Sequence, residues 1–132
     1  MQPEQRVDWY HFDPPTLADP QTLVALAGER IVGFSSFGPT RDADARGAGE
    51  IYALYVDPEH WNTGAGRRLL AESCRRLVEA GYDDGVLWVL RGNETAERFY
   101  LADGWRRDGA TRTEDPYGPR VEVRRFRRRL RD

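Results

Sequence analysis

Two continuous apolar runs around one amphipathic segment constrain the fold of this chain more than any other feature. The runs are EIYALYV at residues 50–56 and GVLWVL at residues 85–90, and runs of this length suit strands covered on both faces. Between them, apolar residues recur at helical spacing, and Gly81 can end that helix in the left-handed conformation. Strand, helix and strand in this order predict a right-handed βαβ unit.

The rest of the chain divides into a short flap and one domain. Four prolines in residues 1–21 predict an irregular flap. Residues 22–132 form the predicted domain, which opens with a hairpin around Gly28-Glu29 and a surface loop at 38–49. A second helix is predicted from Glu94 to Asp103, followed by two strands joined by EDPYGPR at residues 114–120.

Composition excludes several classes of function. The chain has 132 residues, enough for one domain with a modest core. No apolar run reaches the roughly 20 residues of a membrane helix, and we expect no secretory leader. The single cysteine, Cys74, is predicted to be a buried core thiol and permits a reducing compartment, so we expect a cytoplasmic location without a membrane partner.

The charged residues point to neither nucleic acid nor metal. The net charge is −2, and we interpret RRFRRRL at residues 124–130 as a solvated edge strand and not as a nucleic-acid surface. There is no lysine, which excludes every lysine-dependent mechanism. His11 and His60 are isolated and form no metal spacing with Cys74, so no metal cofactor is expected.

The turn NTGAGRR at residues 62–68 carries the strongest functional signal. Glycines between a strand and a helix leave consecutive N–H groups free to form a concave anion site. Arg67 and Arg68 stand in the first helical turn, where the helix dipole alone disfavours cations, and a phosphate would give them a partner. The alternative is a tight turn that uses glycine only for its backbone.

Two common phosphate motifs do not fit this turn. A dinucleotide fingerprint needs a third glycine where the chain has Leu69. A P-loop needs a lysine, which the chain lacks.

Two segments resemble the GNAT superfamily of N-acetyltransferases. LYVDPEHWNTGAGRRLL at residues 54–70 resembles motif A, with Trp61 in place of the usual Gln or Arg. NETAERFYLADGW at residues 93–105 resembles motif B, with Trp105 in place of Phe. The resemblance implies an α/β fold with a mixed sheet that splays between the fourth and fifth family strands. It also implies acetyl-CoA in the splay as the acyl donor, and direct acetyl transfer to a primary amine.

The resemblance also assigns the cofactor contacts. The backbone of Leu54, Tyr55 and Val56 is expected at the pantetheine, and Asn93 at the pantetheine arm, where a plain helix N-cap is the alternative. Arg68 lies at the rim of the expected pyrophosphate site. The pyrophosphate itself is expected at Asn62, Thr63, Gly64, Ala65, Gly66 and Arg67.

Aminolysis of a thioester needs an acid, a base and an oxyanion donor. By resemblance Tyr100 protonates the leaving thiolate, with a core aromatic as the alternative. Glu50 is the candidate base through a water chain, with a solvated carboxylate as the alternative. The next strand, Val86–Leu90, has no carboxylate that could replace it. A backbone N–H near Val56 would serve the oxyanion.

The segment before residue 22 is shorter than in the family. We therefore expect the strand at 22–27 to be an exposed edge unless the flap or a second subunit covers it. The helices that wall the acceptor site in the family are missing as well, so we expect this site to be open or to be completed by the partner of a homodimer. The acceptor, a small-molecule or peptide amine, is not named by any motif. A second hypothesis is an acyl-CoA-binding or regulatory module with little turnover.

Overall fold

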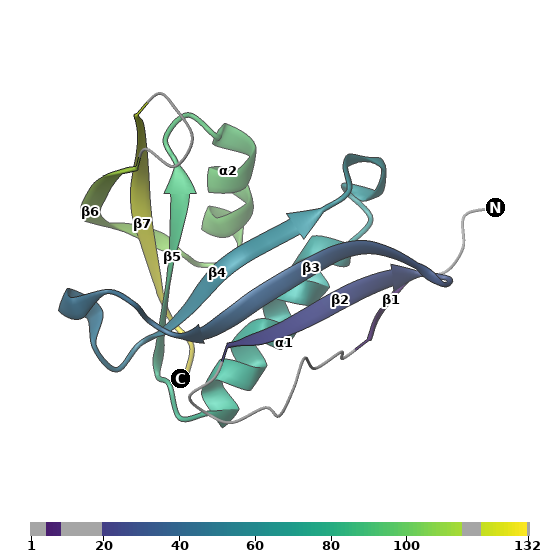
Figure 1. Ribbon diagram of the computed structural model, residues 1–132, viewed down its shortest axis with the longest axis horizontal. Helices are drawn as coiled ribbons and strands as arrows, with labels where there is room; N and C mark the ends of the chain where they lie inside the picture. The colour runs from purple at the N-terminus through teal and green to yellow at the C-terminus, as the bar shows by residue number, and fades with distance from the viewer. Residues whose placement is uncertain (1–4, 9–19, 115–119, 132) are drawn as a thin grey trace.

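The described chain forms a single mixed sheet with two α-helices packed on it. The computed structural model describes residues 5–8, 20–114 and 120–131. In these ranges the strand order is β1-β2-β3-β4-β5-β7-β6 (Figure 1), and only β4 and β5 are parallel neighbours. The strands are β1 (Gln5–Asp8), β2 (Gln21–Ala27), β3 (Arg30–Pro39), β4 (Gly49–Val56), β5 (Asp84–Leu90), β6 (Arg106–Glu114) and β7 (Val121–Arg129).

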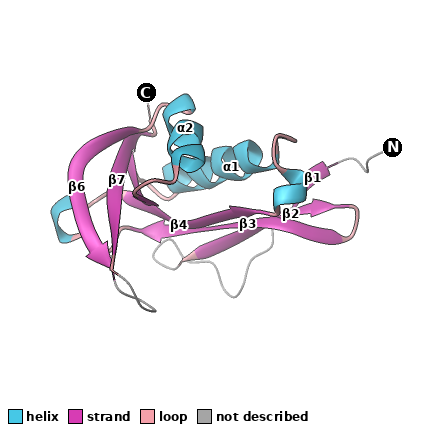
Figure 2. Ribbon diagram, turned by 90° about the horizontal axis from the view of Figure 1, so that it is seen from above, coloured by secondary structure: helices cyan, strands magenta, loops and turns pink. Residues whose placement is uncertain are grey.

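The predicted βαβ unit is confirmed. Strand β4 leads through the short 3₁₀ helix η2 (Pro58–His60) into α1 (Ala65–Glu79), which returns the chain to β5. Both helices lie on one face of the sheet (Figure 2). The buried face of α1 contains Leu69, Leu70, Cys74 and Leu77, as its periodicity predicts. None of the described helices is long and apolar enough to cross a membrane.

The hairpin and the second helix are also confirmed. Gly28, at the tip between β2 and β3, has a φ of 64°, which favours glycine. Helix α2 (Glu94–Ala102) is N-capped by Asn93, whose side chain accepts from the Ala96 amide at 3.1 Å. Gly104, with a φ of 96°, follows its C-terminus. A 3₁₀ helix, η1 (Ala43–Ala45), lies in the loop between β3 and β4.

The expected irregular flap contains a strand. Residues 5–8 pair antiparallel with β2, from Gln5 opposite Ala27 to Asp8 opposite Val24. The prediction treated residues 1–21 as one segment with four prolines. Residues 4–13 contain no proline, so this stretch keeps all the N–H donors that a strand needs. The β2 edge is therefore paired along four residues and not exposed there. The other residues of the expected flap lie outside the described ranges.

The arginine-rich segment is not an edge strand. It forms β7, which lies between β5 and β6, because the last hairpin places its second strand beside β5. An interior strand can hold so many arginines because carboxylates neutralise them. Arg124 lies near Glu97, Arg127 near Asp84 and Arg128 near Asp103.

Candidate active site

Strands β4 and β5 pair at their beginnings and then diverge. The paired positions are Gly49–Gly85, Glu50–Val86 and Ile51–Leu87. Beyond them β4 turns away from β5 (Figure 1) but stays paired with β3 as far as Val56. The β5-facing backbone of residues 54–56 therefore has no strand partner in the described part of the chain. This is the splay that the family resemblance predicted.

A β-bulge at Tyr52 reverses the side-chain alternation of β4. Ile51 and Ala53 pair with consecutive residues of β3, which leaves Tyr52 without a partner there. Ile51 belongs to the helix-side core before the bulge, and Leu54 packs against the same core after it. The apolar run suggested a strand covered on both faces, but one face is exposed from Ala53 onward.

The turn between β4 and α1 presents unused backbone donors. Asn62 and Gly64 have φ values of 63° and 93°, and α1 begins at Ala65 directly afterwards. The first amides of a helix have no acceptor within the helix. No described residue accepts a hydrogen bond from the amides of residues 62–67. These donors and the helix dipole make the turn suitable for an anion.

Trp61 fixes this turn to the end of β4. Its indole Nε1 donates to the Val56 carbonyl at 2.8 Å, while the residue remains 53% exposed. The Thr63 hydroxyl donates to the His60 carbonyl within the same turn. Trp61 replaces a polar residue of the family motif. Its indole N–H group thus holds the turn against the strand backbone.

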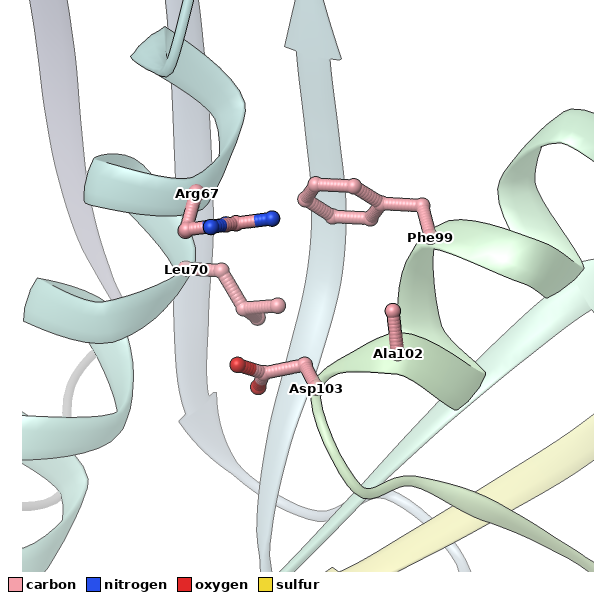
Figure 3. A pocket seen from close by; sticks show the side chains of 5 residues that line it. All are labelled: Arg67, Leu70, Phe99, Ala102 and Asp103. Carbon is pink, nitrogen blue, oxygen red and sulfur yellow. The ribbon is translucent and has the colours of Figure 1, made fainter.

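Arg67 and Arg68 are exposed on the first turn of α1, which contains no acidic residue. Figure 3 shows Arg67 projecting from α1 towards α2, where Phe99 and Asp103 face it across a hollow of about 310 Å³. The positive end of the helix therefore has two additional cations. Both arginines lie at the position where we expect the pyrophosphate rim, which stays a prediction.

Gly66 faces the space between β4 and α2. A Cβ atom at this position would lie 3.5 Å from Phe99 Cζ and 3.5 Å from Val56 Cγ2, which is ordinary contact. Glycine costs a helix about 1 kcal/mol relative to alanine. Because the fold has room for a Cβ atom here, packing does not explain why this helix position is glycine and not alanine.

Tyr100 lies in the core between the two helices. Its side chain is 9% exposed and belongs to the same core cluster as Cys74 and Trp105. Cys74 is thus the buried core thiol that we predicted, and the burial of Tyr100 fits the core aromatic that was the alternative to the acid. Burial, with a smaller effect of the Cys74 thiol, raises the pKa of Tyr100 to about 12. The hydroxyl is therefore neutral at ordinary pH and can act as a donor.

Glu50 is buried, so it is not the solvated strand-start carboxylate that was the alternative to a catalytic base. The residue is 1% exposed. Its Oε1 accepts from the Thr40 hydroxyl at 3.1 Å and from the Arg41 amide at 3.0 Å, and Arg41 Nη2 donates to Oε2 at 2.9 Å. A carboxylate with three donors is held in one orientation.

Glu50 also lines a cavity of about 290 Å³ on the face of the sheet away from the helices. Leu87 and Val89 of β5 belong to the helix-side core. Successive side chains of a strand point to opposite faces, so Trp88, which lines the cavity, lies on the other face. The polar and aromatic residues around the cavity are Arg41, Glu50, Tyr52, Trp88, Arg112 and Glu114. Tyr100 and the glycine turn thus lie on one side of the splay, and Glu50 on the other.

Sequence reasoning missed the rest of this cavity. Arg41 belongs to a stretch that we interpreted only as a surface loop, and Arg112 lies on a strand far along the chain. No local pattern brings them together, because the contact depends on the order of β5, β7 and β6. In the described part of the chain no group of three or more His, Cys, Asp or Glu residues could hold a metal ion.

The acetyltransferase (GNAT) family matches residues 2–105, and the chain belongs to this family. An uncharacterised N-acetyltransferase, YuaI of Bacillus subtilis, is 40% identical over 72 residues, which are 54% of this chain and 41% of that protein. The L-amino acid N-acyltransferase MnaT of Escherichia coli is 32% identical over 98 residues, 74% of this chain and 54% of that protein. The chain thus spans about half the length of these relatives.

Solved structures share the fold. The structure of yncA, a putative acetyltransferase from Salmonella typhimurium with its cofactor acetyl-CoA, superposes with a TM-score of 0.71 at 22% identity. The superposition covers 86% of this chain and 66% of that one. The fold is therefore that of GNAT acetyltransferases.

Proposed function

We propose that this chain transfers an acetyl group from acetyl-CoA to a primary amine by direct attack on the thioester. The observation that carries the proposal is the splay of β4 from β5, with a free strand edge that ends in the glycine turn. One continuous path of backbone donors and acceptors suits a long, flexible ligand with a pyrophosphate at one end. Acetyl-CoA is such a ligand.

The donor would bind along this path. The free edge of residues 54–56 would pair with the pantetheine amides, and the amides of residues 62–67 would take the pyrophosphate beside Arg67 and Arg68. The Val56 carbonyl already accepts a hydrogen bond from Trp61 Nε1, so the pantetheine would use the other groups of this edge. Asn93 caps α2 through its oxygen, which leaves its NH₂ group for the pantetheine arm.

The chemistry would take place where the strands separate. The amine nitrogen attacks the acetyl carbonyl carbon, and the carbon–sulfur bond breaks as the tetrahedral intermediate collapses. Tyr100, neutral and on the helix side, would give its proton to the departing thiolate. A backbone N–H near Val56 would stabilise the oxyanion. Alignment of the two reactants supplies much of the rate enhancement.

Glu50 would receive the proton of the incoming ammonium through water from the cavity side. Alkyl ammonium groups have pKa values of about 8 to 10.4, so a base is needed near neutral pH. The three donors around Glu50 fix its position facing the cavity. A cytoplasmic location, a homodimer and the division of the chain at residue 22 remain predictions.

The proposal is tested by release of CoA. We expect acetyl-CoA to raise the melting temperature, to bind by calorimetry and to yield free CoA thiol when a suitable amine is added. Tight binding without thiol release across a broad amine panel would support the binding-module hypothesis instead. No binding of any acyl-CoA would contradict both hypotheses.

A further inference from the structure

The cavity on the far face of the sheet contains charges of both signs beside the splay. We propose that the acceptor is a small zwitterion, an α-amino acid, whose carboxylate binds Arg41 while its amine reaches the splay. The inference rests on the proposed function, because it names the acceptor for the same site.

The Arg41 side chain makes two contacts and keeps hydrogen-bond donors that no described residue uses. Its guanidinium carbon lies 4.6 Å from the centroid of the Tyr52 ring, and Nη2 donates to Glu50 at 2.9 Å. No described residue accepts from its Nε or Nη1, and the side chain is 65% exposed. Stacking and the ion pair fix the plane of the guanidinium, which leaves an edge for a carboxylate to bind in bidentate fashion.

The second arginine of the cavity is already neutralised. Arg112 stacks over the Trp88 ring at 4.2 Å, and its Nε donates to Glu114 at 2.9 Å. Its Nη1 also lies 3.6 Å from Asp42. Arg112 thus has two carboxylate partners, whereas Arg41 pairs with Glu50 alone among the described residues, so Arg41 is the better site for an incoming carboxylate.

The charges around the cavity balance. Two arginines, Arg41 and Arg112, face two carboxylates, Glu50 and Glu114. A zwitterion enters such a site without adding net charge, whereas a simple ammonium or a simple anion adds one unit in a partly desolvated place. The site therefore favours an acceptor with both charges.

The loop that carries Arg41 is anchored to the sheet by hydrogen bonds. Asp42 accepts from Trp88 Nε1 at 2.9 Å and from Arg125 Nη1 at 3.3 Å. Asp44 accepts from Arg125 at 2.7 Å and 3.0 Å. These bonds tie the loop to β5 and β7, so little conformational entropy is lost when the acceptor binds.

The position of Arg41 sets the spacing between the two charges of the acceptor. Arg41 covers Tyr52, which is the residue at which β4 leaves β5. An amine directed into the splay therefore has its carboxylate near Arg41 only if the two groups are close together. This condition selects α-amino acids over amines with a distant carboxylate.

The reaction that follows is balanced. The ammonium loses one proton to solvent through Glu50, and its nitrogen forms a bond to the acetyl carbon. The carbon–sulfur bond breaks, and the thiolate takes a proton from Tyr100 and leaves as the CoA thiol. The second proton lost by the nitrogen returns to Tyr100. The product is an N-acetyl amino acid, which has lost its positive charge and therefore no longer matches the neutral cavity. The loss of charge complementarity would assist its release.

A panel of L-amino acids, each paired with its amide, tests the inference in a CoA-release assay. The wild type should have a higher kcat/KM for amino acids than for amides, and Arg41→Gln should reduce this preference roughly 10- to 100-fold. Arg41→Lys, which keeps the charge but not the bidentate edge, should retain part of the preference. Arg46→Gln, an exposed change in the same loop, should leave it intact.

The preference is the informative quantity, because damage to Glu50 in an Arg41 variant would lower the activity on both members of a pair. Equal or better use of the amides by the wild type would overturn the inference while the proposed function stands. A preference that survives Arg41→Gln would also overturn it. Failure of acetyl-CoA to bind or turn over with any amine would instead overturn the proposed function.

Discussion

At the scale of single residues, two neighbouring glycines of the turn have different physical roles. Gly64 has a φ of 93°, which a side chain rarely adopts, whereas a Cβ atom at Gly66 would meet only ordinary contacts. The backbone thus explains one glycine and not the other. The proposed ligand explains the second, because a Cβ atom there would point into the space between β4 and α2.

The pair of variants Gly64→Ala and Gly66→Ala separates these roles. Gly64→Ala should lower the free energy of unfolding by about 1–2 kcal/mol, because it forces alanine into the left-handed region. Gly66→Ala should leave it unchanged or raise it by up to about 1 kcal/mol, yet weaken acetyl-CoA binding about tenfold or more. Urea denaturation and calorimetry measure the two quantities. Full affinity in Gly66→Ala would remove the support that this glycine gives to the site.

Tyr100→Phe tests the acid. We expect kcat to fall about 10²- to 10⁴-fold with little change in acetyl-CoA affinity, because the hydroxyl acts on the leaving thiolate. The measurement is steady-state CoA release together with calorimetry. A variant with wild-type kcat would show that Tyr100 serves only the core.

The same residue predicts a loss of stability at alkaline pH. Burial raises the pKa of Tyr100 from 10.0 to about 12, so the unfolded chain releases this proton first. Above pH 10 the unfolded state then binds fewer protons than the folded state, and the free energy of unfolding falls as pH rises towards 12. Urea denaturation from pH 9 to 12 should show a shallower decline in Tyr100→Phe than in the wild type. Equal slopes would contradict the assigned burial.

At the scale of elements, β7 and the loop before β4 are joined by Arg125. The residue is 5% exposed, and its guanidinium donates to Asp42 and Asp44 of the loop and to Asp108 of β6. Three segments that are distant in sequence thus meet at one buried charge. The cavity beside Glu50 depends on this junction.

Arg125→Met should therefore destabilise the fold by about 3 kcal/mol, because it leaves carboxylates without their partner. The control is Arg127→Met on the same strand, whose ion pair with Asp84 is about two-fifths exposed on each side and should cost less than about 1 kcal/mol. Urea denaturation compares the two variants. Equal effects would contradict the role given to Arg125.

The elements also show what the sequence could and could not predict. Periodicity located β4, α1 and β5, and the Asn93 cap located α2, because these signals are local. The bulge at Tyr52 and the interior position of β7 were missed, because they depend on which strands pair. Arg41 was missed for the same reason, whereas the glycine turn was found because its residues are consecutive.

At the scale of the whole molecule, the sheet consists of two parts that separate at the proposed site. Strands β1 to β4 form one part, and β5, β7 and β6 form the other. They are joined by the short pairing of β4 with β5 and by the helices that cover one face (Figure 2). The short pairing leaves the β5-facing edge of β4 open beyond Ile51, where the proposed acyl donor would pair.

The most direct test of this account is a titration of acetyl-CoA followed by amide ¹H–¹⁵N NMR. The account predicts saturable shifts that are largest for the amides of residues 62–67 and for the free edge of β4 at residues 54–56. Binding that leaves these amides unchanged, or no binding at all, would contradict the central claim that the splay and its glycine turn hold the acyl donor.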